Sequence, residues 1–368
     1  MLTGPKVSLL RLQATPTCNL NCTYCYISET VRRQTGTMDP EILETVLHRL
    51  VGELLLEDRL TISWHGAEPL AAGLAWYESA FRTIESVLDR AVRVSHVFQT
   101  NGVLLSNEWC SFIKEHDATI GVSLDGSEEQ NAARVNWAGR PAYRSAMRGV
   151  ELLNRNGIAW TLLSVVTRAT MEDPTAFVNF VRSTGCSNLG FKVEETNVSN
   201  TSQLELGGVD VEAAYTNFVR ALWEAFPEND LVRVREFDGY RAARSSSPRK
   251  QAVPVTLIPL RNLTVAVNGD FTIFAGELLF QDDDSFVFGN VLDGPLLDCL
   301  KSDRFNMLAE DILSGVQKCA TNCEHYGDCG SFYISQKFAE TGSFDADETL
   351  ACRLEMKTMY KALDGMHR

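Results

Sequence analysis

Hydrophobic and polar residues alternate along the first half of the chain with two periods, one typical of strands and one typical of helices. Short apolar runs predict strands at 7–15, 60–66, 92–102, 118–126, 158–167 and 189–195. Stretches with helical periodicity lie between them, at 38–58, 75–91, 106–116, 142–157 and 174–184. Such alternation predicts parallel strands with crossover helices. Six units of this kind predict an α/β fold, a partial (β/α)6 barrel, with functional loops at the C-terminal ends of its strands.

The pattern changes after residue 195. Residues 211–226 are helical, whereas residues 241–250 are polar and loop-like. From residue 255, two β-rich runs flank Asn268-Gly269, which predicts a hairpin. We therefore divide the chain into three expected parts. They are a barrel at 1–210, a helical linker at 211–254 and a smaller C-terminal module at 255–368.

Composition narrows the class of protein. The chain has 368 residues, of which 45% are hydrophobic and 22% are charged, as in ordinary globular proteins. Its net charge of -14, without a basic stripe, argues against a nucleic-acid partner. No apolar run is long enough to span a membrane, and the N-terminus lacks a signal-peptide pattern. We expect a cytoplasmic protein with no membrane partner.

Ten cysteines in such a chain indicate metal binding or catalysis rather than disulfides. Seven of them form two sets. The first set is Cys18, Cys22 and Cys25, and the second is Cys319, Cys323, Cys329 and Cys352. The other three, Cys110, Cys186 and Cys299, stand alone and are expected to be buried as small apolar side chains.

Three closely spaced thiolates suit zinc or an iron–sulfur cluster. A structural zinc ion needs four protein ligands, and no further cysteine follows Cys25 until Cys110. A [4Fe–4S] cluster held by three thiolates would leave one iron open for a substrate or cofactor. Zinc completed by a distant histidine, or three unrelated thiols, are the alternatives.

The C-x3-C-x2-C spacing, with Tyr24 before the last cysteine, resembles that of the radical S-adenosylmethionine (SAM) enzymes. "HGAEPL" at 65–70 resembles the family's "GGEP" stretch, with Ala67 in place of the second glycine, and "QTNG" (99–102) and "GVSLDG" (121–126) resemble further family segments. The resemblance implies a catalytic [4Fe–4S] cluster on Cys18, Cys22 and Cys25 that cleaves SAM to a 5′-deoxyadenosyl radical. It also implies an electron donor such as flavodoxin or ferredoxin.

The same resemblance implies a set of SAM-binding residues. They are Tyr24, Gly66, Ala67, Glu68, Pro69, Gln99, Asn101, Ser123, Asp125 and Arg134. The "GAEP" stretch would meet the amino group of SAM. Ser123 and Asp125 would lie near the ribose, and Arg134 would bind the carboxylate.

The four tail cysteines, taken by themselves, predict a closed site for zinc or a [4Fe–4S] cluster. The tail resembles the SPASM/twitch extension, in which these four positions hold the outer auxiliary cluster. Ligands of the inner auxiliary cluster are missing, because Phe274 and Ala275 follow the hairpin turn and Tyr333 stands four residues after Cys329. We therefore expect two [4Fe–4S] clusters in total.

The resemblance further implies a maturase of ribosomally made precursor peptides (RiPPs), similar to the cyclophane-forming subgroup. Such an enzyme abstracts a side-chain hydrogen, here expected from Cβ, and links that carbon to an aromatic ring. The alternatives are formylglycine formation as in anaerobic sulfatase maturases, thioether formation, epimerisation, and a non-catalytic Fe–S or zinc scaffold. Leader recognition requires a separate leader-binding protein or a groove in this chain.

Other polar residues have two interpretations each. His65 is expected to be a packed loop histidine. The remaining candidates either face the substrate or have a structural role. They are Lys192, Glu194, Arg235, Glu236 and Asp238.

Overall fold

The computed structural model describes residues 5–197, 199–205, 210–245, 258–274, 276–281, 284–331 and 333–366. Within them the strands form one sheet in the order β10-β9-β8-β1-β2-β3-β4-β5-β6-β7. The strands are β1 (Val7–Leu12), β2 (Leu56–Trp64), β3 (Arg93–Thr100), β4 (Thr119–Ser123), β5 (Trp160–Val166), β6 (Asn188–Val193), β7 (Arg233–Val234), β8 (Asn262–Val265), β9 (Asp270–Thr272) and β10 (Gly289–Asn290).

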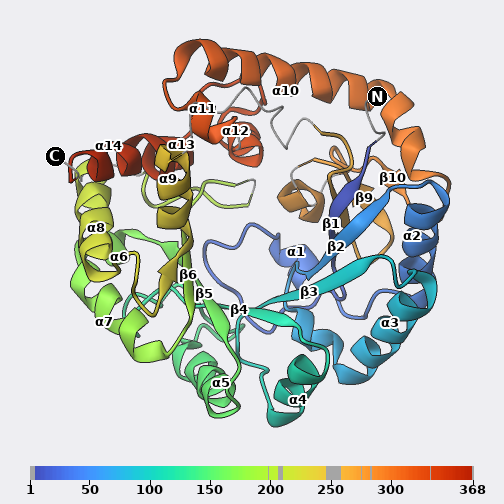
Figure 1. The fold of residues 1–368 in the computed structure, drawn as a ribbon, viewed down its shortest axis with the longest axis horizontal. Coiled ribbons are helices and arrows are strands. Elements are labelled where there is room, and N and C mark those ends of the chain that lie inside the picture. Colours follow the sequence, from blue (N-terminus) through green and yellow to red (C-terminus); the bar gives the residue numbers. More distant parts are fainter. Residues whose placement is uncertain are drawn as a thin grey trace.

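Strands β1 to β6 are parallel and follow chain order, which confirms the predicted α/β fold and its six units. Figure 1 shows the strands along the inside of an incomplete ring, with helices around the outside. The helices of this half are α1 (Glu29–Arg32), α2 (Pro40–Gly52), η1 (Pro69–Ala72), α3 (Leu74–Val87), α4 (Asn107–Glu115), α5 (Tyr143–Arg155), α6 (Arg168–Glu172) and α7 (Pro174–Thr184).

Local signals in the sequence fix several helix starts. Asp39 caps α2 by accepting a hydrogen bond from Glu41 N at 2.9 Å, and Ser106 caps α4 by accepting one from Trp109 N at 3.3 Å. Strand β2 begins at Leu56, earlier than its apolar run predicts. Its first four residues include three charged ones, and pairing with the neighbouring strands β1 and β3 extends the strand.

The sheet continues into the C-terminal half of the chain. Strand β8 pairs in parallel with β1 and forms an antiparallel hairpin with β9, as Asn268-Gly269 predicts. Strand β7 pairs with β6 and lies between α8 (Val211–Ala225) and α9 (Arg235–Ser245). The sheet thus crosses the predicted boundaries at 210 and 254, and a division into three parts stays a prediction.

Helix α9 corrects the loop expected at 241–250, because it runs to Ser245. Arg244 Nε donates to Asp364 Oδ1 at 2.9 Å, and Tyr240 OH donates to the same oxygen at 2.7 Å. These contacts with the far end of the chain hold a polar segment in a helix that its local sequence does not predict. Residues 246–250 lie outside the described residues.

The tail places most of its helices on the side of the ring that β1 to β6 leave open (Figure 1). They are η3 (Gly276–Phe280), η4 (Leu296–Lys301), α10 (Asp303–Asn322), α11 (Tyr326–Cys329), α12 (Ile334–Thr341), α13 (Leu350–Cys352), η5 (Arg353–Thr358) and α14 (Met359–Asp364). Both η5 and α14 contact α8, and η5 also contacts β6. Among the described helices, none has the length and apolar character that a membrane crossing requires.

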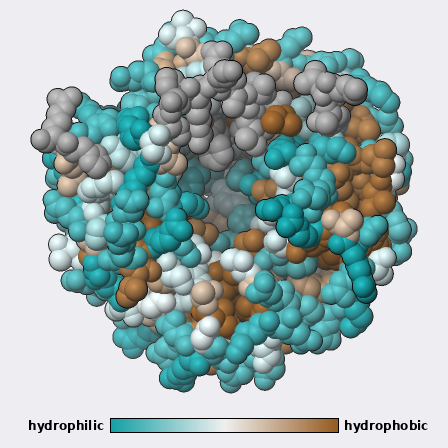
Figure 2. All heavy atoms as spheres, in the orientation of Figure 1, coloured by the Kyte–Doolittle hydropathy of each residue, from teal (hydrophilic) through white to brown (hydrophobic). Residues whose placement is uncertain are grey.

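The main core lies between the sheet and its outer helices. It includes a group of aromatic rings in which Trp64 meets Tyr77 edge to face at 5.1 Å between ring centroids. The three lone cysteines, Cys110, Cys186 and Cys299, are all buried, as expected. The polar motifs instead follow the C-terminal ends of β1, β2, β3 and β4. Parallel strands bring these ends to one edge of the sheet, where the site is built. Figure 2 shows that this face of the molecule is hollowed near the centre of the ring.

Candidate active site

The loop between β1 and α1 carries the first three cysteines. Segment 133–137 fixes its backbone: Asn21 N donates to Val135 O at 2.7 Å, and Trp137 Nε1 donates to Cys18 O at 2.8 Å. All three thiols belong to partly buried residues. Burial raises the pKa of Cys18 to about 12 and that of Cys22 to about 11. A metal cluster at this loop must therefore displace thiol protons when it binds.

Glu68 is a buried carboxylate that joins the ends of β2 and β3. It accepts hydrogen bonds from Thr100 Oγ1 at 2.7 Å, Asn101 N at 2.8 Å and Leu70 N at 3.0 Å. Burial raises its pKa to about 7. These contacts make Glu68 a positioning residue for the strand ends around the cysteine loop.

Gln99 and Ser123 meet at the ends of β3 and β4. Gln99 Nε2 donates to Ser123 Oγ at 2.6 Å. A Cβ on Gly121 would lie 2.4 Å from Gln99 Oε1, so the glycine of "GVSLDG" makes room for this side chain. Asn101 Nδ2 donates to Asn19 Oδ1 at 2.7 Å and thereby ties the "QTNG" turn to the cysteine loop.

Asp125 and Arg134 form a buried ion pair. Arg134 Nε and Nη2 donate to the two carboxylate oxygens of Asp125 at 3.0 and 2.9 Å. Tyr24 OH and Val165 N also donate to this carboxylate. Arg134 lies close enough to Cys22 to oppose the rise in that thiol's pKa caused by burial. Asp125 and Arg134, expected on the ribose and the carboxylate of SAM, bind each other here.

The "HGAEP" loop has a constrained backbone. Gly66 has φ +93°, and a Cβ there would lie 3.1 Å from the Phe280 ring, whereas Ala67 adopts φ +57° with a methyl group. Pro69 begins η1. His65 Nε2 lies 2.9 Å from Tyr26 OH, as expected of a packed loop histidine. Its pKa is lowered to about 4, mainly by burial.

The other polar candidates bind partners within the chain. Lys192 forms an ion pair with Glu195 at 2.7 Å, and Glu194 Oε1 accepts a hydrogen bond from Gln203 N at 3.2 Å. The remaining pairs are Arg235–Glu236 at 2.5 Å and Arg233–Asp238 at 2.7 Å. These contacts support a structural role for each residue in the present conformation.

Glu355 is a buried tail residue that the sequence motifs do not mark. Its carboxylate accepts hydrogen bonds from Val193 N of β6 at 2.7 Å and from Tyr333 OH at 2.8 Å. Burial raises its pKa to about 7, although Lys192 opposes the rise. In the sequence, Glu355 is an acidic residue within a helical pattern of apolar positions. That pattern does not distinguish a buried glutamate from an exposed one.

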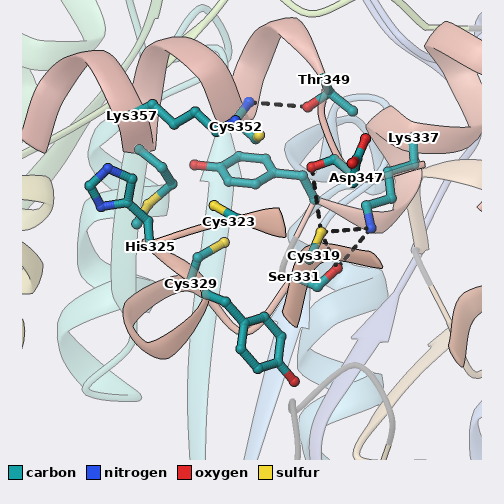
Figure 3. Close-up of a pocket in the computed structure, with 13 residues that line it drawn as sticks. Cys319, Cys323, His325, Cys329, Ser331, Lys337, Asp347, Thr349, Cys352 and Lys357 are labelled. Carbon is teal, nitrogen blue, oxygen red and sulfur yellow. Dashed lines mark hydrogen bonds between the residues drawn. The ribbon is translucent and has the colours of Figure 1, made fainter. Parts of the chain in front are cut away.

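The four tail cysteines come together from separate elements. Cys319 lies on α10, Cys323 follows that helix, Cys329 ends α11 and Cys352 ends α13. All four line one cavity, together with residues that include Lys337 and Lys357 (Figure 3). The structure thus assembles the set that the spacing predicts.

Two positions where the inner auxiliary cluster would need ligands hold aromatic rings. Phe274 is buried and stacks on Phe305 at 6.0 Å between ring centroids. Tyr333 is buried with its hydroxyl on Glu355. Ala275 lies outside the described residues.

Among the described residues, no group of three or more His, Cys, Asp or Glu side chains is arranged so that it could hold a single metal ion. A zinc ion in the tail would therefore require its thiols to move toward one another. The donor chemistry fits an iron–sulfur cluster at both sets. Cys18 lies close enough to Cys22 and Cys25 to interact with them electrostatically, and the four tail cysteines line one cavity.

Residues 12–181 match the family described as the Radical SAM superfamily. An uncharacterized protein of Synechocystis sp. is 30% identical over 371 residues, covering 98% of this chain and 92% of that protein. This chain belongs to the radical SAM superfamily. Family membership implies SAM and one [4Fe–4S] cluster as cofactors.

Relatives that are named for an activity cover less of the chain. A serine-type anaerobic sulfatase-maturating enzyme of Bacteroides thetaiotaomicron is 32% identical over 179 residues, which is 47% of this chain and 43% of the relative. A cysteine-type anaerobic sulfatase-maturating enzyme of Clostridium perfringens is 28% identical over 247 residues, covering 64% of this chain and 65% of the relative.

Two solved structures have the same fold over most of the chain. Native anSMEcpe with bound AdoMet and Cp18Cys peptide has a TM-score of 0.75 and 21% identity, covering 98% of both chains. Streptococcus suis SuiB bound to S-adenosylmethionine has a TM-score of 0.66 and 14% identity, covering 95% of this chain and 78% of SuiB.

Proposed function

We propose that this protein is a radical SAM maturase of a ribosomally made peptide. It abstracts a side-chain hydrogen, from Cβ, and links that carbon to an aromatic ring of the same peptide. The observation that carries the proposal is the pairing of two thiol sets in one chain, three at the mouth of the barrel and four in the tail. The sulfatase-maturating relatives support it, as does the fold shared with anSMEcpe and SuiB, each of which has a structure with a bound peptide.

The first set would hold the catalytic cluster through Cys18, Cys22 and Cys25, with SAM on the remaining iron. When bound, the cluster and SAM supply a 5′-deoxyadenosyl radical. The strand-end residues described above would hold SAM and exclude water. Glu68 fixes the backbone of Asn101, and Gln99 fixes the hydroxyl of Ser123.

The tail set would hold an auxiliary [4Fe–4S] cluster through Cys319, Cys323, Cys329 and Cys352. Closure of a carbon–carbon link requires the crosslinked radical to lose one electron and one ring proton. The auxiliary cluster would accept the electron, and water would accept the proton. A flavodoxin or ferredoxin would supply electrons to the cluster held by the first set. We place the reaction in the cytoplasm.

The absence of inner-cluster thiols at Phe274 and Tyr333 favours carbon–carbon closure over thioether formation. A substrate sulfur would find no iron there to bind. Formylglycine formation is the second candidate, because the relatives include both serine-type and cysteine-type sulfatase-maturating enzymes. Epimerisation and a non-catalytic scaffold are the weaker alternatives.

The deciding experiment is mass spectrometry of a peptide encoded beside the gene, after anaerobic turnover with SAM and a reductant. Loss of two hydrogens, with fragmentation blocked between an aromatic residue and a nearby residue, supports the proposal. An aldehyde confined to one Ser or Cys supports formylglycine formation. An unchanged mass with one hydrogen exchanged from solvent indicates epimerisation. A scaffold would release no 5′-deoxyadenosine.

Metal content tests the cofactors separately. Anaerobic reconstitution should give about eight irons per chain, four for each cluster. About twelve irons would reveal an inner cluster, and about four irons with bound zinc would make the tail a zinc site.

A further inference from the structure

Lys337 is a buried lysine beside the tail cysteines. It lies on α12 and is 4% exposed. Its Nζ donates hydrogen bonds to Ser331 Oγ at 2.8 Å, Gly315 O at 3.2 Å and Cys319 Sγ at 3.3 Å. Figure 3 shows the Nζ directed at the sulfur and at the serine hydroxyl. All three protons of the ammonium group therefore have acceptors, one of which is a predicted cluster ligand.

None of these acceptors is a carboxylate. In the part of the chain that the structure describes, no Asp or Glu forms a direct ion pair with Lys337; Asp345 interacts with it electrostatically but is paired with Lys318. A buried charge without a counter-ion is strongly unfavourable unless an anionic group compensates for it. Four thiolates around a [4Fe–4S] cluster would form such a group.

A second lysine at the same cavity provides the contrast. Lys357 also lines the cavity, but it forms an ion pair with Glu348. At Cys352 the two charges act in opposite directions, because Lys357 lowers the pKa of the thiol and Glu348 raises it. Both lysines thus border the same cavity, but of the two only Lys357 forms an ion pair among the described residues.

Ser331 supports the position of Lys337. It adopts φ +62°, a left-handed conformation that is unfavourable for a residue with a Cβ. Its hydroxyl lies between the two groups: it accepts from Lys337 Nζ and is 3.4 Å from Cys319 Sγ, to which it donates. Cys319 Sγ therefore receives two hydrogen bonds from one small network.

We propose that Lys337 raises the reduction potential of the auxiliary cluster and so makes it an electron acceptor for crosslink closure. The inference rests on the proposed function, in particular on a [4Fe–4S] cluster in the tail. Reduction adds one negative charge to the cluster, and a nearby cation that donates to a ligand sulfur stabilises that added charge. One electron passes from the crosslinked substrate radical to the oxidised cluster, and the ring proton goes to water.

The test measures the potential of the tail cluster alone. A background with Cys18→Ala, Cys22→Ala and Cys25→Ala removes the first cluster, and the full chain is reconstituted with iron and sulfide. Metal analysis precedes a redox titration followed by electron paramagnetic resonance. Lys337→Met keeps the length of the side chain and removes its charge, whereas Lys357→Met is the matched control.

Lys337→Met should raise the ratio of oxidised to reduced cluster at a fixed solution potential about tenfold, which is about 59 mV for a one-electron couple. Lys357→Met should change this ratio much less. Ser331→Ala, which keeps the lysine, should shift the ratio in the same direction as Lys337→Met but by a smaller factor.

Equal ratios in the Lys337→Met variant and its parent, with four irons in each, would overturn the proposal. If Lys337→Met loses its iron, Lys337→Gln takes its place. Loss of iron from both would assign Lys337 to cluster binding rather than to its potential, which also overturns the proposal. Zinc instead of iron in the parent would overturn the auxiliary cluster itself, and the metal analysis separates that failure from the others.

Discussion

Both cysteine sets lie beside buried cations, but these cations differ in how they contact the sulfurs. Arg134, near Cys22, is held by two hydrogen bonds to the Asp125 carboxylate. Lys337, bonded to Cys319, has only a hydroxyl, a carbonyl and a sulfur as acceptors. Arg32, which acts on Cys22 and Cys25, is also buried with neutral acceptors, namely Ile27 O, Leu20 O and Asn21 Oδ1. The tail differs in that its cation, Lys337, donates a hydrogen bond directly to a predicted ligand sulfur, Cys319 Sγ.

This difference matches the two electron roles in the proposed function. The first cluster must donate an electron to SAM. The auxiliary cluster must accept an electron, which a cation bonded to one of its ligand sulfurs favours. The two sites therefore differ in the contact between cation and sulfur as well as in ligand number.

The strongest test of the comparison removes a ligand from the first set. Cys22→Ala should reduce 5′-deoxyadenosine release to the background rate, because the catalytic cluster loses one of three thiolates. The tail should still bind about four irons. Cys186→Ala, at a lone buried cysteine, is the control and should keep release. Release at the wild-type rate by Cys22→Ala would refute the assignment of the first set.

The reciprocal variant removes a ligand from the tail. Cys329→Ala should permit SAM cleavage but reduce crosslinked product, because the electron released on closure loses its acceptor. Iron should fall from about eight to about four per chain. Crosslinking at the wild-type rate would show that the tail cluster is not the acceptor. Circular dichroism checks whether the tail remains folded.

A stability measurement tests whether Arg134 depends on its counter-ion. Asp125→Ala leaves Arg134 buried without a partner, and we expect a loss of about 3–5 kcal/mol in the free energy of unfolding. Glu151→Ala breaks an exposed pair with Arg155, in which the Glu151 and Arg155 side chains are 58% and 74% exposed, and should cost less than about 1 kcal/mol. Denaturant titration of the cluster-free protein measures both, and equal losses would contradict the comparison.

The contrast between local and distant contacts also explains what the sequence could predict. Motif spacing identified both cysteine sets, and capping residues such as Asp39 and Ser106 marked helix starts, because these features depend on neighbours in the chain. The pairing of Asp125 with Arg134 was not predicted, although each residue was expected near SAM. Side-chain partners depend on packing that spacing does not determine.

The tail residues show the same limit more strongly. Glu355 bonds to Val193, 162 positions earlier, and Lys337 bonds to Cys319 from another helix. Neither residue belongs to a recognisable motif. The extension of α9 to Ser245 likewise depends on Asp364, so a polar composition alone predicts a loop there.

Glu355 joins the tail to strand β6 of the barrel through its bond with Val193 N, and its titration tests that contact. Its ordinary pKa of 4.5 is raised to about 7 in the folded protein, mainly by burial. The folded state therefore holds a proton that the unfolded state releases between these values. The resulting stability is present below about pH 4.5 and is lost as the pH rises through about 7.

Glu355→Gln removes this titration while keeping an acceptor for Val193 N. The wild-type free energy of unfolding, relative to that of the variant, should fall by roughly 1–3 kcal/mol between about pH 5 and pH 8. Glu324→Gln, at a side chain that is 90% exposed, is the control. Parallel pH profiles for wild type and Glu355→Gln would show that Glu355 does not gain a proton on folding.

The smallest expected effects concern two residues with left-handed backbone conformations, Ala67 in the barrel and Ser331 in the tail. Ala67, with φ +57°, has only a methyl group, so Ala67→Gly should relieve strain and stabilise the protein by about 0.5–1 kcal/mol. Ser331, with φ +62°, uses its hydroxyl to connect Lys337 to Cys319. Ser331→Gly relieves similar strain but loses two hydrogen bonds worth about 1 kcal/mol each, so it should destabilise the protein slightly. Thermal unfolding of the cluster-free variants gives the two signs. Stabilisation by both glycines would show that the Ser331 hydroxyl contributes nothing to the tail, and the network around Lys337 would lose its support.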